Sequence, residues 1–232
     1  LARLSPSATA SGDGHRVVGD NGQVLDAVGA HALRVPPRTP GDPGEAEGVS
    51  LFHAVKGATG LPVERQPRLD HRNAAILRLD GVACGQGALL GPVGKGAALL
   101  SEVIDRATVV LCAEMLGGMS EAFDLTLEYL KTREQFGVPI GRFQALKHRA
   151  AKLDMEIELS RSCVMAAARA MDAGQQDAAK LVSLAKARCS DAYVLAGNEG
   201  VQFFGGVGMT DEYDIGFYMK RARASELTFG DS

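Results

Sequence analysis

The stretch from Gly200 to Gly208, GVQFFGGVG, has the composition of a turn whose backbone could bind phosphate. A glycine pair after a helix lets the backbone approach a ligand closely, and exposed amide N–H groups at such a turn can bind phosphate oxygens. Gly-Gly turns are also common between ordinary helices. The residues alone therefore leave two interpretations open, an anion-binding turn and a plain helix connection.

Several other kinds of site are excluded by spacing. Residues 87–96, GALLGPVGKG, are not a Walker loop, because Gly94-Lys95 is followed by glycine instead of Ser or Thr. No GxGxxG follows a predicted strand, which argues against a nicotinamide-binding unit. The helical stretches hold no Glu-x-x-His pair, and the four cysteines form no CxxC. We therefore expect no metal site and no disulfide framework.

Residues 1–90 carry short apolar runs separated by turn signals. We read Asp20-Asn21-Gly22 as a tight turn between strands, Ala32–Val35 as a strand, and 38–48 as a solvent loop. Two further strands are expected at Val49–Val55 and at Ala74–Leu79, the second closed by Asp80-Gly81. Together these runs predict a small antiparallel β domain.

From about residue 97 the apolar residues recur at steps of three and four, as on one buried helix face. A long helix is expected over the first part of 101–144, ending in the turn 131–137, with Gly137 as a left-handed cap and Pro139 as a stop. Further helices are expected from Leu146 to Gly174, from Ala178 to about 197–200, and over Ile215–Glu226. The fold class is therefore α+β, a β domain (1–90), a glycine-rich hinge (91–96) and an up-and-down helical bundle (97–232).

The segment TREQFGVPIGRFQ, residues 132–144, resembles the signature of acyl-CoA dehydrogenases. Within that family it looks most like the pimeloyl-CoA dehydrogenase small-subunit type. Gln-x-x-Gly-Gly-x-Gly, here Gln202, Gly205, Gly206 and Gly208, resembles the family's second signature. The resemblance implies the family's bundle fold and α,β-desaturation of an acyl-CoA thioester with FAD as cofactor.

The resemblance also implies where the cofactor would lie. In the family these two turns reach the adenine and pyrophosphate end of an FAD that lies largely across a subunit interface. The partners implied are an acyl-CoA substrate, a homo- or hetero-oligomer with another dehydrogenase subunit, and an electron-transferring flavoprotein as acceptor. The cofactor-binding residues carried over are Arg133, Gln135, Phe136, Gln144, Gln202, Gly205 and Gly206.

The catalytic base of the family is harder to find in this chain. The usual Glu, just after the last short helix, aligns with Gly230, and the alternative Glu position on the long helix aligns with Ala107. Asp231, one residue displaced, is the nearby carboxylate and a weak candidate. Three interpretations follow, a catalytic dehydrogenase subunit, a silent subunit that completes a partner's FAD site, and a related flavin oxidase.

The resemblance implies a role in fatty acid metabolism and lipid degradation, and composition excludes several other classes of protein. A net charge of −3 and a pI near 6.0 give no general attraction to nucleic acid. No run approaches 18 apolar residues, so no membrane span is expected, and the cysteine usage favours a cytoplasmic setting. Compared with the family, the N-terminal helical domain and the first strands of the β domain are not represented, so we expect the chain to be a fragment.

Overall fold

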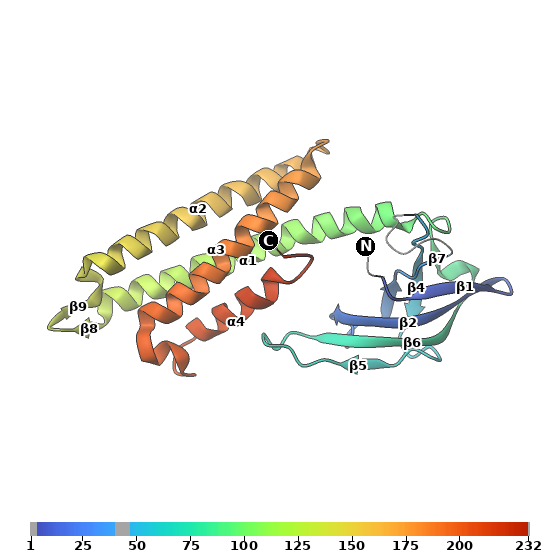
Figure 1. The fold of residues 1–232 in the computed structure, drawn as a ribbon, viewed down its shortest axis with the longest axis horizontal. Helices are drawn as coiled ribbons and strands as arrows, with labels where there is room; N and C mark the ends of the chain where they lie inside the picture. Colours follow the sequence, from blue (N-terminus) through green and yellow to red (C-terminus); the bar gives the residue numbers. More distant parts are fainter. Residues whose placement is uncertain (1–3, 40–46, 232) are drawn as a thin grey trace. The chain divides into compact units, whose positions relative to one another are not determined.

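The computed structural model describes residues 4–39 and 47–231, which form two compact units (Figure 1). The first unit comprises residues 1–103 and the second residues 104–232. Their boundary falls inside the long helix α1 (Gly96–Thr132). The domain limits expected from the sequence, with a hinge at 91–96, stay a prediction.

The first unit consists of two antiparallel sheets around one apolar core. One sheet has the strand order β1-β2-β6-β5 and the other β3-β4-β7. Phe52, Leu77 and Val82 are fully buried between them, which confirms the antiparallel β architecture. The strands are β1 (Ser7–Ser11), β2 (Gly14–Leu25), β3 (Ala32–Val35), β4 (Leu51–Val55), β5 (Val63–Arg65), β6 (Ala74–Cys84) and β7 (Leu89–Leu90).

Two of the turns predicted in this unit are wrong. β2 runs straight through Asp20-Asn21-Gly22, and its register with β6 shifts between Asn21 and Val24. β6 likewise continues through Asp80-Gly81. The register shifts there, because Val17 of β2 pairs with Val82 whereas Gly19 pairs with Leu79. Both sites are bulges, because each strand keeps pairing on the far side of the extra residues. Most of the predicted loop 38–48 lies outside the described residues.

The second unit is a helical bundle with the topology expected from the sequence. Its helices are the rest of α1 with α2 (Gln144–Asp172), α3 (Ala178–Phe204) and α4 (Ile215–Glu226). Met115, Met119 and Leu153 are fully buried in a core that α1, α2 and α3 share. Short connections between the long helices give the up-and-down arrangement seen in Figure 1. No helix of the described residues is long and apolar enough to span a membrane.

Two predicted helix ends need correction. α1 ends at Thr132, and Gly137 is not its cap. Instead Phe136 and Gly137, with φ of +57° and +76°, form the turn of a hairpin between β8 (Glu134–Gln135) and β9 (Val138–Pro139). α3 continues past Gly200 to Phe204. Gly200 serves close packing against α4 and does not end the helix, since a Cβ there would lie 2.6 Å from Ile215 Cδ1.

Candidate functional site

The first candidate turn is the β8–β9 hairpin, which follows directly on α1. The Arg133 amide donates to the Tyr129 carbonyl at 2.8 Å, so the helix hydrogen-bond pattern reaches into the turn. The Ile140 amide then donates to the Arg133 carbonyl at 2.8 Å and closes the base of the hairpin. The backbone at Arg133 is therefore fixed from both sides.

The side chains of this hairpin lie in solvent. Arg133, Gln135 and Phe136 are exposed, and Phe136 is 90% exposed although it is a large apolar residue. Its ring meets that of Phe143 edge-on, with centroids 6.0 Å apart. Gln144, also exposed, is the first residue of α2. This segment therefore presents an exposed aromatic ring, a guanidinium and two side-chain amides to solvent. These groups suit a planar, anionic ligand.

The second candidate turn lies where α3 ends. Gln202 is exposed on the last turn of α3, and Gly205 caps the helix with φ +69°, its amide bonded to the Gln202 and Val201 carbonyls. Gly205 and Gly206 are exposed, with open space where a Cβ would stand. A ligand could therefore approach this backbone closely. Gly208 is different, since a Cβ there would lie 2.7 Å from the Val201 carbonyl oxygen, so this glycine is needed for packing.

Aromatic packing brings the two turns to the same end of the bundle (Figure 1). Phe203 is buried in a cluster with Leu130 from α1 and Ala150 from α2. Next to it, Phe204 stacks on Tyr129 with ring centroids 4.1 Å apart, and the Tyr129 hydroxyl donates to the Phe204 carbonyl at 3.3 Å. The end of α3 is thus fastened to the end of α1, which carries the hairpin.

The charges at this end are compatible with a phosphate-containing ligand. Within the described residues, the Arg133 guanidinium makes no hydrogen bond or ion pair and is free to bind an anion. Arg149 is engaged instead, bonded to Glu199 at 2.8 Å and placed over the Phe203 ring at 5.1 Å. Among the same residues, no three His, Cys, Asp or Glu side chains are grouped to hold a metal ion.

The predicted base positions lie away from these turns. Ala107 is on α1, while Gly230 and Asp231 are exposed in the loop that follows α4. Gly230 has φ +116°, a conformation that side-chain-bearing residues rarely adopt. Its carbonyl accepts a 2.6 Å hydrogen bond from the ammonium group of Lys186 on α3.

Lys186 is not among the residues predicted from the sequence. It is only 4% exposed, although lysine is rarely buried. Burial lowers the pKa of Lys186, against the opposing influence of Cys112, Glu226, Asp231 and Cys189. The signal in the sequence was its position four residues after Val182, on the buried face of the predicted helix, where a charged residue is unexpected.

Comparison with known proteins agrees with this geometry. The family model described as acyl-CoA dehydrogenase, C-terminal domain, matches residues 94–232. Acyl-CoA dehydrogenase IpdE2 of Mycobacterium tuberculosis is 41% identical over 123 residues, covering 53% of this chain and 37% of that protein. Mitochondrial isovaleryl-CoA dehydrogenase of Solanum tuberosum is 31% identical over 193 residues, covering 81% of this chain and 46% of that protein.

The solved structures give the same result over nearly the whole chain. The structure of butyryl-CoA dehydrogenase from Megasphaera elsdenii superposes with a TM-score of 0.92 at 25% identity. It covers 99% of this chain, which in turn covers 61% of that protein. The chain thus spans less than two thirds of the length of the relatives that it matches.

Proposed function

Because this chain belongs to the acyl-CoA dehydrogenase family, whose members depend on FAD, we propose that it is a subunit of an FAD-dependent acyl-CoA dehydrogenase. One observation supports this proposal most strongly: the cluster around Phe203 connects the end of α1, which carries the hairpin at Arg133, to the turn at Gly205. These two turns are far apart in sequence, and only their common position at one bundle end makes a shared ligand site physically reasonable.

The chain's own residues would hold the phosphate-bearing end of the cofactor. Arg133 would donate paired, charge-assisted hydrogen bonds to the pyrophosphate. The open backbone at Gly205 and Gly206 would let the cofactor approach closely, and the exposed Phe136 ring would contact its planar part. Gln135, Gln144 and Gln202, all exposed, would supply amide hydrogen bonds to its polar groups.

Desaturation requires a base for the α-proton of the acyl-CoA, and FAD held by the two turns would supply the acceptor for the β-hydrogen as hydride. This chain has glycine at one family base position, Gly230, and alanine at the other, Ala107. Asp231 is displaced by one residue, and its side chain is one methylene shorter than that of Glu. Misplacement by about 1 Å can lower a rate on the order of a hundredfold. Asp231 is thus a poor base.

We therefore place this chain in a mixed oligomer. Its partner subunit would carry a complete acyl-CoA site with its own Glu, and the present chain would complete the partner's FAD pocket through the turns at Arg133 and Gln202. An electron-transferring flavoprotein would reoxidise the flavin. The glycine and alanine at the base positions support this arrangement over one in which the chain acts alone.

The test is a pair of substitutions in the purified assembly. Asp231→Asn in this chain should leave acyl-CoA-dependent reduction of a dye acceptor within about twofold of the wild type, whereas Glu→Gln in the partner should lower it by at least about a hundredfold. Loss of activity in Asp231→Asn alone would make the present chain the catalytic one. An assembly without a flavin absorption band would contradict the whole proposal.

A further inference from the structure

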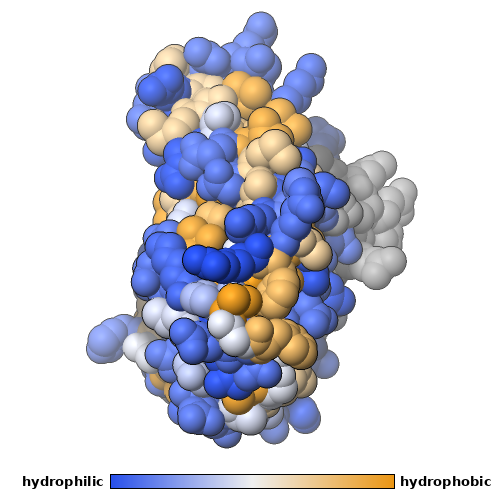
Figure 2. Space-filling view, turned by 90° about the vertical axis from the view of Figure 1, so that its left-hand side faces the viewer, coloured by the Kyte–Doolittle hydropathy of each residue, from blue (hydrophilic) through white to orange (hydrophobic). Residues whose placement is uncertain are grey.

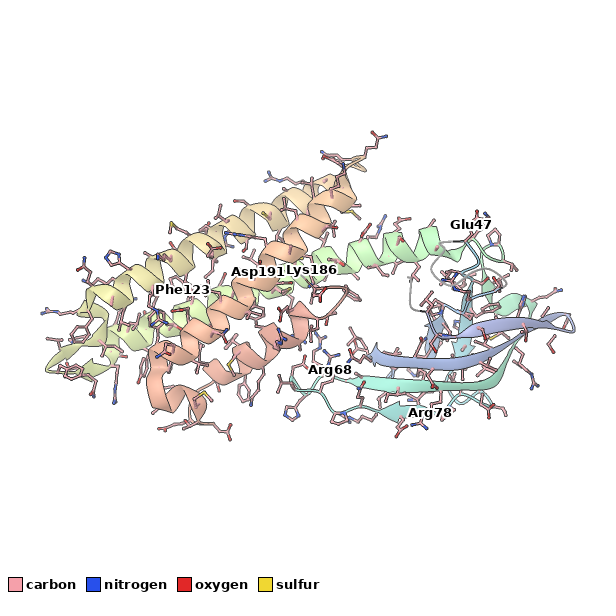
Figure 3. All side chains as sticks on the ribbon, in the orientation of Figure 1. Glu47, Arg68, Arg78, Phe123, Lys186 and Asp191 are labelled. Carbon is pink, nitrogen blue, oxygen red and sulfur yellow. The ribbon has the colours of Figure 1, made fainter. Side chains whose placement is uncertain are left out.

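We propose that Lys186 is a positioning residue that latches the loop after α4, residues 227–231. It holds this loop in a conformation that requires glycine at position 230. Figure 3 labels Lys186 on α3, the helix from which its side chain reaches this loop. That the loop occupies the base region of a dehydrogenase site rests on the proposed function. The latch itself rests on contacts within this chain.

The ammonium group of Lys186 has three hydrogens, and the structure gives each an acceptor. It donates to the Ser190 hydroxyl at 2.8 Å, to the Glu226 carbonyl at 2.8 Å and to the Gly230 carbonyl at 2.6 Å. One bond stays on α3, one reaches the last residue of α4, and one reaches the loop. The side chain therefore ties three segments together.

The position of the α4 terminus explains how a cation is tolerated in this buried place. The last carbonyls of a helix lack partners within the helix and carry partial negative charge. Glu226 supplies such a carbonyl, and the charged groups of Asp231 and Glu226 also favour the protonated amine. Lys186 thus caps α4 from a neighbouring helix and reaches the Gly230 carbonyl from the same position.

Little else holds the loop. Leu227 is 58% and Phe229 is 45% exposed, so apolar packing contributes weakly. Thr228 bonds back to the last turn of α4, through its amide to Ser225 and its hydroxyl to Ala224. Within the described part of the chain, residues 229–231 take part in one hydrogen bond, which Lys186 donates to the Gly230 carbonyl.

The backbone of the latched loop is unusual at two successive residues. Phe229 has φ +61°, which is uncommon for a bulky residue, and Gly230 has φ +116°. A Cβ at Gly230 would meet nothing within 4 Å. Glycine is therefore required by the backbone conformation and not by lack of space. A Glu at position 230 would therefore be strained in the latched backbone, although there is open space for its side chain.

Hydrogen exchange followed by mass spectrometry tests the latch, because it needs neither bound flavin nor substrate. It is measured on the full-length protein in its assembly. Lys186→Met should speed amide exchange at least about tenfold in peptides covering 223–228, the end of α4 and the start of the loop, where the Thr228 amide donates to the Ser225 carbonyl; this is the effect of losing a charged hydrogen bond. Peptides from the middle of α2 should exchange at the wild-type rate. Lys186→Arg, which keeps the charge, should restore part of the protection.

A double-substitution cycle then tests whether Lys186 and Gly230 act together. Gly230→Ala alone should speed exchange of the loop about as much as Lys186→Met, and adding it to Lys186→Met should change little more. Gly174→Ala is the matched control, since Gly174 also has positive φ, +60°, and open space but lies in the turn after α2. Its effect should stay in that turn and be the same with or without Lys186.

Three results would overturn the latch. These are unchanged loop exchange in Lys186→Met, faster exchange throughout the bundle in that variant, and additive effects of Lys186→Met and Gly230→Ala. Failure of the proposed function would look different. An assembly without flavin or turnover in which loop exchange nonetheless follows the cycle would refute the enzyme assignment and leave the latch in place.

Discussion

Two cationic side chains of the helical unit lie in opposite environments. Arg133 stands exposed on the hairpin after α1 and has no polar partner within the described residues, whereas Lys186 is buried and has three. An exposed guanidinium without a partner is available to a ligand. A buried ammonium whose hydrogens are all used serves the protein's own structure.

The Arg133 side chain is expected to act on cofactor affinity alone. Arg133→Ala should weaken FAD retention by about 1.5–3 kcal/mol, the scale of a hydrogen bond to a charged group. Flavin occupancy of the assembly, measured by absorbance after dialysis at low FAD concentration, reports this change. Arg161→Ala is the matched control, because Arg161 pairs with Glu158 on α2 at 3.0 Å, away from the turns. Full occupancy in Arg133→Ala would make Arg133 an ordinary surface charge.

Lys186 should make stability depend on pH in the alkaline range. Its pKa in the folded protein is lowered from the ordinary value of 10.5, mainly by burial. Between these two pKa values the unfolded chain binds more protons than the folded one, so this residue's contribution to stability rises with pH. Urea unfolding of wild type and Lys186→Met should therefore show the wild type gaining stability relative to the variant as the pH rises toward 10.5. A constant difference would contradict the burial of the charge.

At the scale of elements, the contact between α1 and α3 depends on one of two adjacent glycines. A Cβ on Gly118 would overlap the Tyr193 hydroxyl and lie 2.6 Å from Tyr193 Cζ. Tyr193 is 2% exposed, and burial raises its pKa to about 12, so it stays neutral in the core at ordinary pH. Gly117, the preceding residue, is exposed with open space around it. Only Gly118 is therefore needed for the helices to approach.

This difference predicts opposite effects of the same substitution. Gly118→Ala should lower the free energy of unfolding by about 1–3 kcal/mol, because overpacking forces Tyr193 or a helix to move. Gly117→Ala should raise it by about 0.5–1 kcal/mol, because alanine loses less conformational entropy in a helix. Thermal unfolding of the two variants and the wild type measures both changes in stability. Equal effects would mean that the close approach at Gly118 is not tight.

At the scale of the whole molecule, the bundle end that carries both turns presents apolar groups to solvent. Figure 2 looks at the molecule from the side on which β8 and β9 lie in Figure 1, and shows a broken band of apolar residues between hydrophilic ones. Phe136, Met209 and Phe217 are 90%, 74% and 60% exposed. Large exposed apolar side chains that recur in one region are typical of interaction surfaces, in keeping with the proposed shared cofactor pocket.

A pocket shared between subunits predicts that FAD binding depends on assembly. The assembly should carry FAD, whereas a monomer of residues 1–232 should retain little, because it would supply only one side of the site. Flavin absorbance after size-exclusion chromatography, with the mass of each peak, makes the comparison. Tight FAD binding by a monomer of residues 1–232 would contradict the shared pocket.

Local patterns were sufficient for much of this protein. The apolar periodicity predicted α4 at its observed bounds, and β3 likewise, because both depend on short-range spacing and turn residues. The two signature turns were recognised through the family resemblance, which also aligned the usual Glu position with Gly230. These features need no knowledge of what lies across from them.

Only the tertiary structure decided features that depend on a distant neighbour. Asp20-Asn21-Gly22 became a bulge because β6 pairs with β2 on both sides of it. Gly200 was a packing position inside α3 and not a helix end, because Ile215 fills the space that a side chain there would need. Lys186 became a latch because the carbonyls of Glu226 and Gly230 come within its reach. A turn signal or a lysine has the same local chemistry wherever it occurs, and its role is set by the segment that folding places against it.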